Sequence, residues 1–208
     1  MKITWIGQSG YKISTEQTTI YIDPYLSDVV NRVANGPRLV ETPLMPDDVH
    51  ADAIICTHNH LDHLDIDAIQ EMNRELCFIT TTDGKETLQK MGFFNVRAVV
   101  VGETVVVGDI EVTAVFAKHT VEAFGVIINA EGNVLYFSGD TLYDEKLFVV
   151  TVFEPDIAFV CINGKQREID KYNTPLPWKR EHRRISVRAG SHVPSKLSQN
   201  GNGERQQS

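Results

Sequence analysis

The sequence lacks the features of a membrane-spanning, secreted or cysteine-ligated zinc protein. No apolar run reaches about 18 residues, so no membrane span is expected. The opening residues alternate like a strand and contain no signal-peptide core, which predicts a cytoplasmic protein. No CxxC pair occurs, and the cysteines are odd in number. Because Cys56, Cys77 and Cys161 lie in apolar runs, we expect them to be buried, reduced thiols.

Charge is divided unevenly along the chain. Residues 1–164 carry 10 Lys and Arg against 24 Asp and Glu, a net charge of −14, whereas residues 165–208 carry 10 against 4, a net charge of +6. The acidic body gives no support to nucleic-acid binding. The tail has nine apolar residues in 44 and no apolar period. We therefore expect one globular domain over residues 1–164 and an atypical basic tail over residues 165–208 that is partly disordered.

Short strands separated by turn residues make up most of the globular part. Residues 2–7 and 10–14 alternate around a Gly-Gln-Ser-Gly turn, which predicts a hairpin. Further strands are expected at residues 18–22, 53–57, 77–81, 96–101, 104–107, 110–116, 124–129, 134–138 and 157–162, helices at 66–73, 84–91 and 145–153, and a long loop at 27–50. Meandering strands with interspersed helices predict an α+β fold with layered αββα order rather than a Rossmann alternation.

A dense run of histidines directly follows the apolar strand at residues 53–57. His58, His60, Asp62 and His63 fall within six residues. Each neutral imidazole offers one ring nitrogen to a metal, and a carboxylate can bind or bridge cations. His58 and His60 can converge on one cation, whereas the adjacent Asp62 and His63 would serve a second. The alternative is a solvated histidine-rich turn, which the order of strand, ligands and helix disfavours.

Two later residues follow apolar strands in the same way. His119 comes at the end of one apolar strand, and Asp140 follows another. Taken alone, they would be a surface histidine and a turn residue or helix cap. Together with the histidine run, they indicate loops that converge on one edge of a sheet. The sequence therefore predicts a site for two metals, which would hold and activate water for hydrolysis.

These motifs carry a resemblance to a known family. The successive motifs His58-x-His60-x-Asp62-His63, His119 and Gly139-Asp140-Thr141 resemble those of the metallo-β-lactamase superfamily. Three further segments resemble the ascorbate-6-phosphate-lactonase-like branch of metal-dependent hydrolases: Trp5-Ile6-Gly7-Gln8-Ser9-Gly10, Ile22-Asp23-Pro24 and Cys161-Ile162-Asn163-Gly164. The resemblance covers residues 1 to about 164. It implies an αββα sandwich with a dinuclear site at the sheet edge, and the atypical tail of this chain would leave that sandwich incomplete at its C-terminal end.

The resemblance also implies a role for each site residue. The first metal would be held by His58, His60 and His119, and the second by Asp62 and His63, with Asp140 bridging. Asp62 would also serve as the general base, and Asp23 would orient the ligand loop from behind. Asn163 and Lys165 would meet an anionic substrate, with a plain strand-end turn as the alternative.

The chain departs from the family pattern at two places. Relatives often have histidine where this chain has Gln8. The family also expects a helix, a strand and a last histidine ligand after Gly164, and the tail shows no such strand. His192 and His182 are the candidates for that ligand. The switch in charge suggests a frame-shifted or otherwise altered C-terminus, which resequencing the locus would test.

The function implied is a metal-dependent hydrolase that uses a metal-bound hydroxide on an ester, lactone or phosphoester, with a sugar-derived lactone suggested by the family. Two divalent ions are expected, zinc first, with manganese or iron as alternatives. The substrate would be a small, anionic molecule, and a homo-oligomer is left open. The main alternative is a metal-binding protein of the same fold with weak or no catalysis, because the last ligand is missing. A nucleic-acid adaptor that binds through the basic tail is a third reading.

Overall fold

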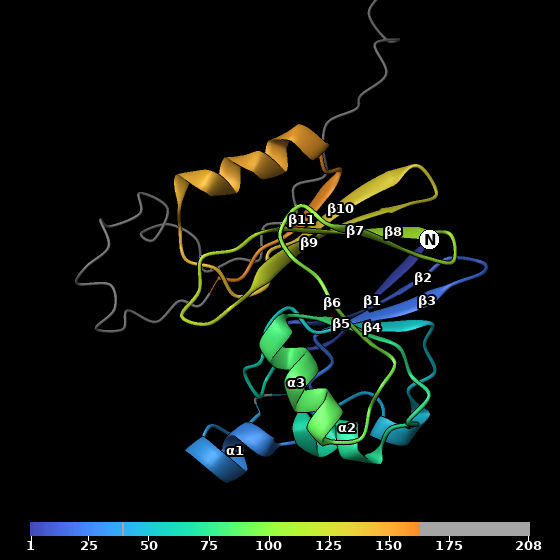
Figure 1. The fold of residues 1–208 in the computed structure, drawn as a ribbon, viewed down its shortest axis with the longest axis vertical. Helices are drawn as coiled ribbons and strands as arrows, with labels where there is room; N and C mark the ends of the chain where they lie inside the picture. Colours follow the sequence, from blue (N-terminus) through green and yellow to red (C-terminus); the bar gives the residue numbers. More distant parts are fainter. Residues whose placement is uncertain (39, 163–208) are drawn as a thin grey trace, which may run out of the picture.

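Two β-sheets packed face to face form the body of the protein, with helices on their outer faces (Figure 1). The computed structural model describes residues 1–38 and 40–162. The first sheet has six strands in the order β1-β2-β3-β4-β5-β6, and the second has five in the order β11-β10-β9-β8-β7. The predicted α+β fold with αββα layering is confirmed.

The two sheets use successive halves of the described chain. The first sheet contains β1 (Lys2–Gly7), β2 (Gly10–Ser14), β3 (Thr19–Ile22), β4 (Ala53–Ile55), β5 (Phe78–Thr80) and β6 (Val96–Ala98). The second contains β7 (Thr104–Val107), β8 (Ile110–Phe116), β9 (Phe124–Ala130), β10 (Asn133–Phe137) and β11 (Ile157–Phe159). The helices are α1 (Val29–Ala34), α2 (Ile66–Glu71) and α3 (Thr82–Lys90), with 3₁₀ helices η1 (Pro46–Asp48) and η2 (Glu145–Phe153).

The central strands of the first sheet are apolar on both faces. In β3, Ile20 and Ile22 point into the core between the sheets, and Tyr21 points toward the helices. In β4, Ile55 and Ile54 divide between the two sides in the same manner. Because β3, β4 and β5 pair in parallel, both faces must be covered, which explains why their sequences are continuously apolar rather than alternating.

Short helices cover the outer faces of both sheets. Helices α2 and α3 bury Ile69 and Leu88 against the first sheet, and η2 buries Val150 against the second. The starts of α2 and α3 are fixed by side-chain caps, because Asp65 accepts a hydrogen bond from Ala68 N and Thr81 accepts one from Gly84 N. Helix layers are therefore set by local capping together with one apolar face.

Two expectations from the sequence need correction. Residues 27–50, expected as a loop, contain α1 and η1; α1 is only six residues long and ends at Asn35, whose φ of 52° is left-handed. The cysteines are free thiols as expected, and Cys56 is buried, but Cys77 is only partly buried and Cys161 is exposed. Among the described residues, β11 is the edge strand of the second sheet, and Cys161 follows it, so fewer described neighbours cover Cys161.

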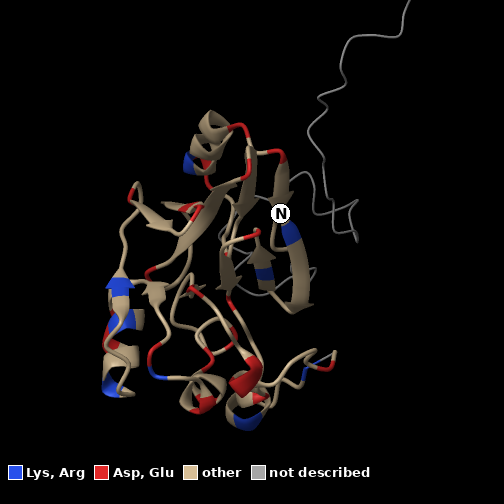
Figure 2. Ribbon diagram, turned by 90° about the vertical axis from the view of Figure 1, so that its right-hand side faces the viewer, with Lys and Arg blue, Asp and Glu red and all other residues tan. Residues whose placement is uncertain are grey.

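Acidic residues are spread over the loops and helices of both halves (Figure 2), and the sequence has fewer basic residues than acidic ones. Within the described residues, no helix is both long enough and apolar enough to cross a membrane.

The sheets are joined to each other where β4 ends. Phe124 N donates a hydrogen bond to Thr57 O (3.1 Å), and His58 forms an isolated bridge with Ala123. Asp23, the residue after β3, lies at the same edge because its N–H donates to Ile55 O (2.8 Å). This edge therefore gathers the ends of strands from both sheets.

Candidate metal centre

The histidine run forms a compact turn that is held at both ends. It begins directly after β4, and within it His63 N and Leu64 N both donate to His60 O, at 3.0 and 2.7 Å. At its far end, Asp65 Oδ1 accepts from Ala68 N (3.1 Å) and caps α2. The side chains of the run therefore start from a fixed backbone.

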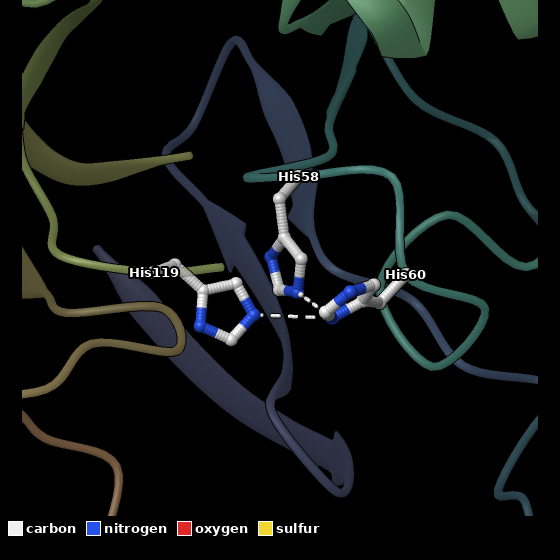
Figure 3. A group of neighbouring side chains, drawn as sticks. All are labelled: His58, His60 and His119. Atoms are coloured by element: carbon white, nitrogen blue, oxygen red, sulfur yellow. Dashed lines mark hydrogen bonds between the residues drawn. The ribbon is translucent and has the colours of Figure 1, made fainter. Parts of the chain in front are cut away.

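Three imidazoles from two parts of the chain form the first ligand group. His58 and His60 come from the run, and His119 comes from the segment between β8 and β9, with the rings turned toward one another (Figure 3). His60 Nδ1 lies 3.1 Å from His58 Nε2 and 3.1 Å from His119 Nε2. One ligand atom from each ring lies within 4.8 Å of the other two. The structure thus brings together all three residues predicted for the first metal.

A second ligand group lies beside the first and contains His58, His63 and Asp140. Their ligand atoms also lie within 4.8 Å of one another, and His63 Nε2 is 3.6 Å from Asp140 Oδ1. Asp62, predicted for the second metal, has Oδ2 3.8 Å from His63 Nε2 and is one-third exposed. It borders this group rather than belonging to it.

The tautomer of His58 follows from its buried neighbours. The Thr57 hydroxyl donates its only hydrogen to Asp23 Oδ2 (2.8 Å), so it must accept at His58 Nδ1, 3.1 Å away. His58 Nδ1 therefore carries the proton, and Nε2 presents a lone pair toward His60. Because this single nitrogen can bind only one cation and lies against His60, we assign His58 to the first group and not to the second.

Asp23 fixes His63 in the same way. This carboxylate is almost fully buried and accepts from Thr57 N (2.7 Å), from the Thr57 hydroxyl and from His63 Nδ1 (2.8 Å). With Nδ1 donating to Asp23, His63 Nε2 faces Asp140. Asp23 therefore occupies the supporting place predicted for it and orients ligands from both groups.

Burial favours the neutral, metal-binding form of His58 and His119. Burial, followed by the charge of the neighbouring histidines, lowers the pKa of His58 to about 2. Burial is also the main cause that lowers the pKa of His119. Burial opposes charge on His63, but the Asp23 and Asp140 carboxylates outweigh it and raise its pKa well above the ordinary value. Burial opposes charge on Asp140 as well, yet the hydrogen bond with His63 holds its pKa below the ordinary range.

The donor set fits divalent cations. His58 Nε2 presents a lone pair toward His60 Nδ1, which also faces His119 Nε2, so a cation placed among these nitrogens could be bound by one lone pair from each ring. The adjacent imidazole and carboxylates add a mixed nitrogen and oxygen set, which suits zinc, manganese or iron.

Asp65 is a supporting residue that the sequence did not reveal as such. Its carboxylate is fully buried and accepts from Leu26 N (2.9 Å), Ser27 N (2.7 Å) and Ser27 Oγ (2.6 Å), in addition to capping α2. It ties the segment after β3 to the histidine run. Its place at the start of an expected helix was the one available signal.

Cys161 also contributes where no role was predicted. Its Sγ donates to Asp140 Oδ1 (3.2 Å), and its backbone N donates to Ser138 Oγ (2.9 Å). Although Cys161 keeps an exposed surface, partial desolvation of its thiol, followed by the charge of Asp140, raises the pKa of Cys161 to about 12, so the thiol remains a donor. It therefore helps to orient Asp140.

The remaining predicted residues lie outside the part of the chain that the structure describes. These are Asn163, Lys165, His182 and His192. Their roles stay predictions, as does the division of the chain at residue 164.

Comparisons with known proteins identify the family of this chain. A family model described as "Beta-lactamase superfamily domain" matches residues 18–187, so the match extends past residue 164. A UPF0173 metal-dependent hydrolase of Methanosphaera stadtmanae is 34% identical over 183 residues, covering 79% of this chain and 73% of that protein.

Solved structures show the same fold. A possible metal-dependent hydrolase from Veillonella parvula superposes with a TM-score of 0.65 at 26% identity, covering 79% of this chain and 74% of that one. An isothiocyanate hydrolase from Delia radicum gut bacteria gives a TM-score of 0.64 at 23% identity over 76% and 70% of the two chains, a likeness of fold alone. The chain therefore belongs to the metallo-β-lactamase superfamily, where it groups with relatives named as metal-dependent hydrolases.

Proposed function

We propose that this protein is a metal-dependent hydrolase that cleaves an ester, lactone or phosphoester bond in a small anionic molecule. The observation that carries the proposal is the pair of adjacent ligand groups, one of three imidazoles and one that adds His63 and Asp140. Two cations held side by side are a known arrangement for hydrolysis. The matching relatives are named as metal-dependent hydrolases, which supports the same reaction class.

Two sets of residues would each hold one cation. His58, His60 and His119 would hold the first, His63 and Asp140 would hold the second, and the Asp62 carboxylate beside that group would complete its coordination. When bound, such cations lower the pKa of a coordinated water and polarise the scissile group. Zinc suits the imidazole-rich set, and manganese or iron suits the carboxylates.

Asp62 is placed to move the proton. Its carboxylate is partly exposed beside His63 Nε2, and a solvent-facing carboxylate at that place can accept the proton of the attacking water and return it to the leaving oxygen. Asp23 remains buried behind His63 and keeps that ring from turning. The acidic body supplies little positive charge for an anionic substrate, so the cations would supply it (Figure 2). A sugar-derived lactone is proposed from the branch that the motifs resemble.

A turnover assay with matched variants tests the proposal. The full chain is loaded with zinc or manganese and assayed on bis(p-nitrophenyl) phosphate and on a chromogenic γ-lactone. We expect turnover that falls about 100-fold or more in Asp62→Asn, because the proton acceptor is lost. His50→Ala serves as the control, since His50 is an exposed histidine that precedes β4. Absence of turnover on every ester, lactone and phosphodiester tried would contradict the proposal.

A second candidate is a metal-binding protein of the same fold with weak or no catalysis. The observation that favours it is that His58 belongs to both groups but can bind only one cation. If His58 binds the first cation, the second group is left with His63 and Asp140. One bound cation per chain with no turnover would favour this candidate. Two cations with turnover would rule it out.

A further inference from the structure

The turn between β1 and β2 reaches the candidate metal centre through the side chain of Gln8. Gln8 Nε2 donates to Asp62 Oδ2 at 3.4 Å, a long hydrogen bond. Within residues 1–38 and 40–162, no other group donates a hydrogen bond to the Asp62 carboxylate, and His63 Nε2 lies 3.8 Å from Oδ2. Gln8 is thus the one described residue that donates a hydrogen bond to the Asp62 carboxylate.

The backbone at Gln8 is unusual for its residue type. Its φ is 52°, in the left-handed region that residues with a Cβ avoid. The side chain makes no local hydrogen bond that would offset this, because its amide points to a residue 54 positions away. Left-handed residues other than glycine persist where the surrounding structure imposes them, and they cluster at functional sites.

The surrounding turn is held so that Gln8 cannot relax. Trp5 Nε1 donates a hydrogen bond to Gln8 O (2.9 Å), so the indole N–H of this half-exposed side chain is satisfied within the turn. Gly10 packs so closely that a Cβ there would lie 2.9 Å from Gly7 O and 3.1 Å from Asp23 O. The turn is therefore locked between its own indole and the backbone of Asp23, the residue that orients His58 and His63.

We propose that Gln8 is a positioning residue for Asp62 and that the left-handed turn serves to aim its amide at the centre. The inference rests on the proposed function and adds to it by naming what holds the proton-accepting carboxylate. An amide N–H engages one carboxylate oxygen and carries no charge that repels a cation. The Oδ1 atom of Asp62 is then left free to accept a proton.

Gln8→Gly tests the inference, with Ser9→Ala as a matched control in the same turn. Glycine removes the amide but fits the left-handed backbone, and the Ser9 side chain makes no hydrogen bond within the described residues. With bis(p-nitrophenyl) phosphate as the probe, we expect kcat of Gln8→Gly to fall about 10–100-fold with little change in KM. We also expect its metal-free melting temperature to rise by roughly 2–4 °C, because the strain is relieved. Ser9→Ala should change neither quantity.

Two further variants separate positioning from folding. Gln8→His restores a donor of similar reach and should recover most of the lost kcat. Trp5→Phe frees the Gln8 carbonyl and should lower kcat in the same direction, with no further loss when combined with Gln8→Gly, because both act through one contact. Wild-type kcat in Gln8→Gly, or a fall in kcat matched by a fall in melting temperature, would overturn the inference.

The rise in melting temperature on zinc binding tests the role of Gln8 without requiring turnover, so it can fail independently of the proposed function. At a fixed zinc concentration, zinc binding raises the melting temperature by an amount that grows with the logarithm of its affinity for the folded chain. We expect that rise to be smaller in Gln8→Gly than in wild type and unchanged in Ser9→Ala, even if wild type cleaves none of the probes. An equal rise in all three proteins would overturn the role of Gln8 whatever the turnover shows.

Discussion

Asp23 sets the orientation of two histidines at once, although it belongs to neither ligand group. Three donors converge on its buried carboxylate: Thr57 N, the Thr57 hydroxyl and His63 Nδ1. Asp23→Asn offers a single acceptor oxygen and turns an NH₂ group toward one of these donors. We expect it to lower the free energy of unfolding by about 2–3 kcal/mol and zinc affinity by about 10–100-fold. Urea unfolding and competition with a chromophoric chelator measure the two effects.

Asp47→Asn is the control for Asp23→Asn, because Asp47 is an exposed carboxylate in η1. It should change stability by no more than about 0.5 kcal/mol and leave zinc affinity unchanged. Equal losses of affinity in the two variants would mean that lost charge, rather than lost orientation, is responsible.

Gly139 holds Asp140 in place, and Gly132 provides its matched comparison. Both have left-handed φ values, 54° and 72°, so alanine strains both backbones alike. A Cβ at Gly139 would lie 3.1 Å from Thr57 Oγ1 and 3.3 Å from Phe124 O, whereas one at Gly132 meets nothing within 4 Å. We expect Gly132→Ala to cost about 1–2 kcal/mol of stability and Gly139→Ala to cost more. Only Gly139→Ala should also weaken metal binding, because the displaced Thr57 hydroxyl no longer orients His58.

At this scale the sequence predicts which residues gather but not how each one is held. The spacing of His58, His60 and His63 and the strand-end positions of His119 and Asp140 were sufficient to predict one cluster. The contacts of Gln8 and Cys161 with that cluster join residues far apart in the chain, and no local pattern encodes them. Burial of Cys161 was wrongly predicted because an apolar run does not reveal that its strand lies at a sheet edge.

Among the elements, α2 and α3 begin with side-chain caps that differ in what else they do. Thr81 caps α3 alone, whereas Asp65 caps α2 and also binds the amides of Leu26 and Ser27. Thr81→Ala should therefore cost about 1 kcal/mol of stability and leave zinc affinity unchanged. Asp65→Asn should cost about 2–3 kcal/mol, because buried donors lose a charged acceptor, and should weaken zinc binding as well.

Urea unfolding and chelator competition on the two cap variants check this difference. If Thr81→Ala weakened zinc binding as much as Asp65→Asn, the coupling would come from general loosening of the helix layer. It would not come from the tie between Asp65 and the segment after β3.

Elements with a strong apolar period were predicted well, and short ones were not. The hairpin of β9 and β10 and helix α3 lie close to their expected ranges. Helix α1 was missed because its six residues lie among prolines and polar residues and bury only Val29. Its position depends on tertiary contacts, such as the ion pair between Arg32 and Asp67 of α2 (2.7 Å), which a single segment does not reveal.

Across the whole molecule, the candidate centre depends on both halves of the described chain. His58, His60 and His63 come from the side of the first sheet, and His119 and Asp140 follow strands of the second. The hydrogen bond from Phe124 N to Thr57 O joins the two sheets at that edge. The αββα order was predictable from strands that meander and helices that lie between them, but the meeting of the two halves follows only from their packing.

Metal content per chain tests the account most directly. The full-length protein is saturated with zinc, passed through a desalting column and measured by elemental mass spectrometry. We expect two zinc ions per wild-type chain, one in His119→Ala and one in Asp140→Asn, because each change removes a member of a different ligand group. His50→Ala should retain two. A wild-type chain that holds one zinc ion or none, or a His119→Ala variant that holds as much zinc as wild type, would contradict the account.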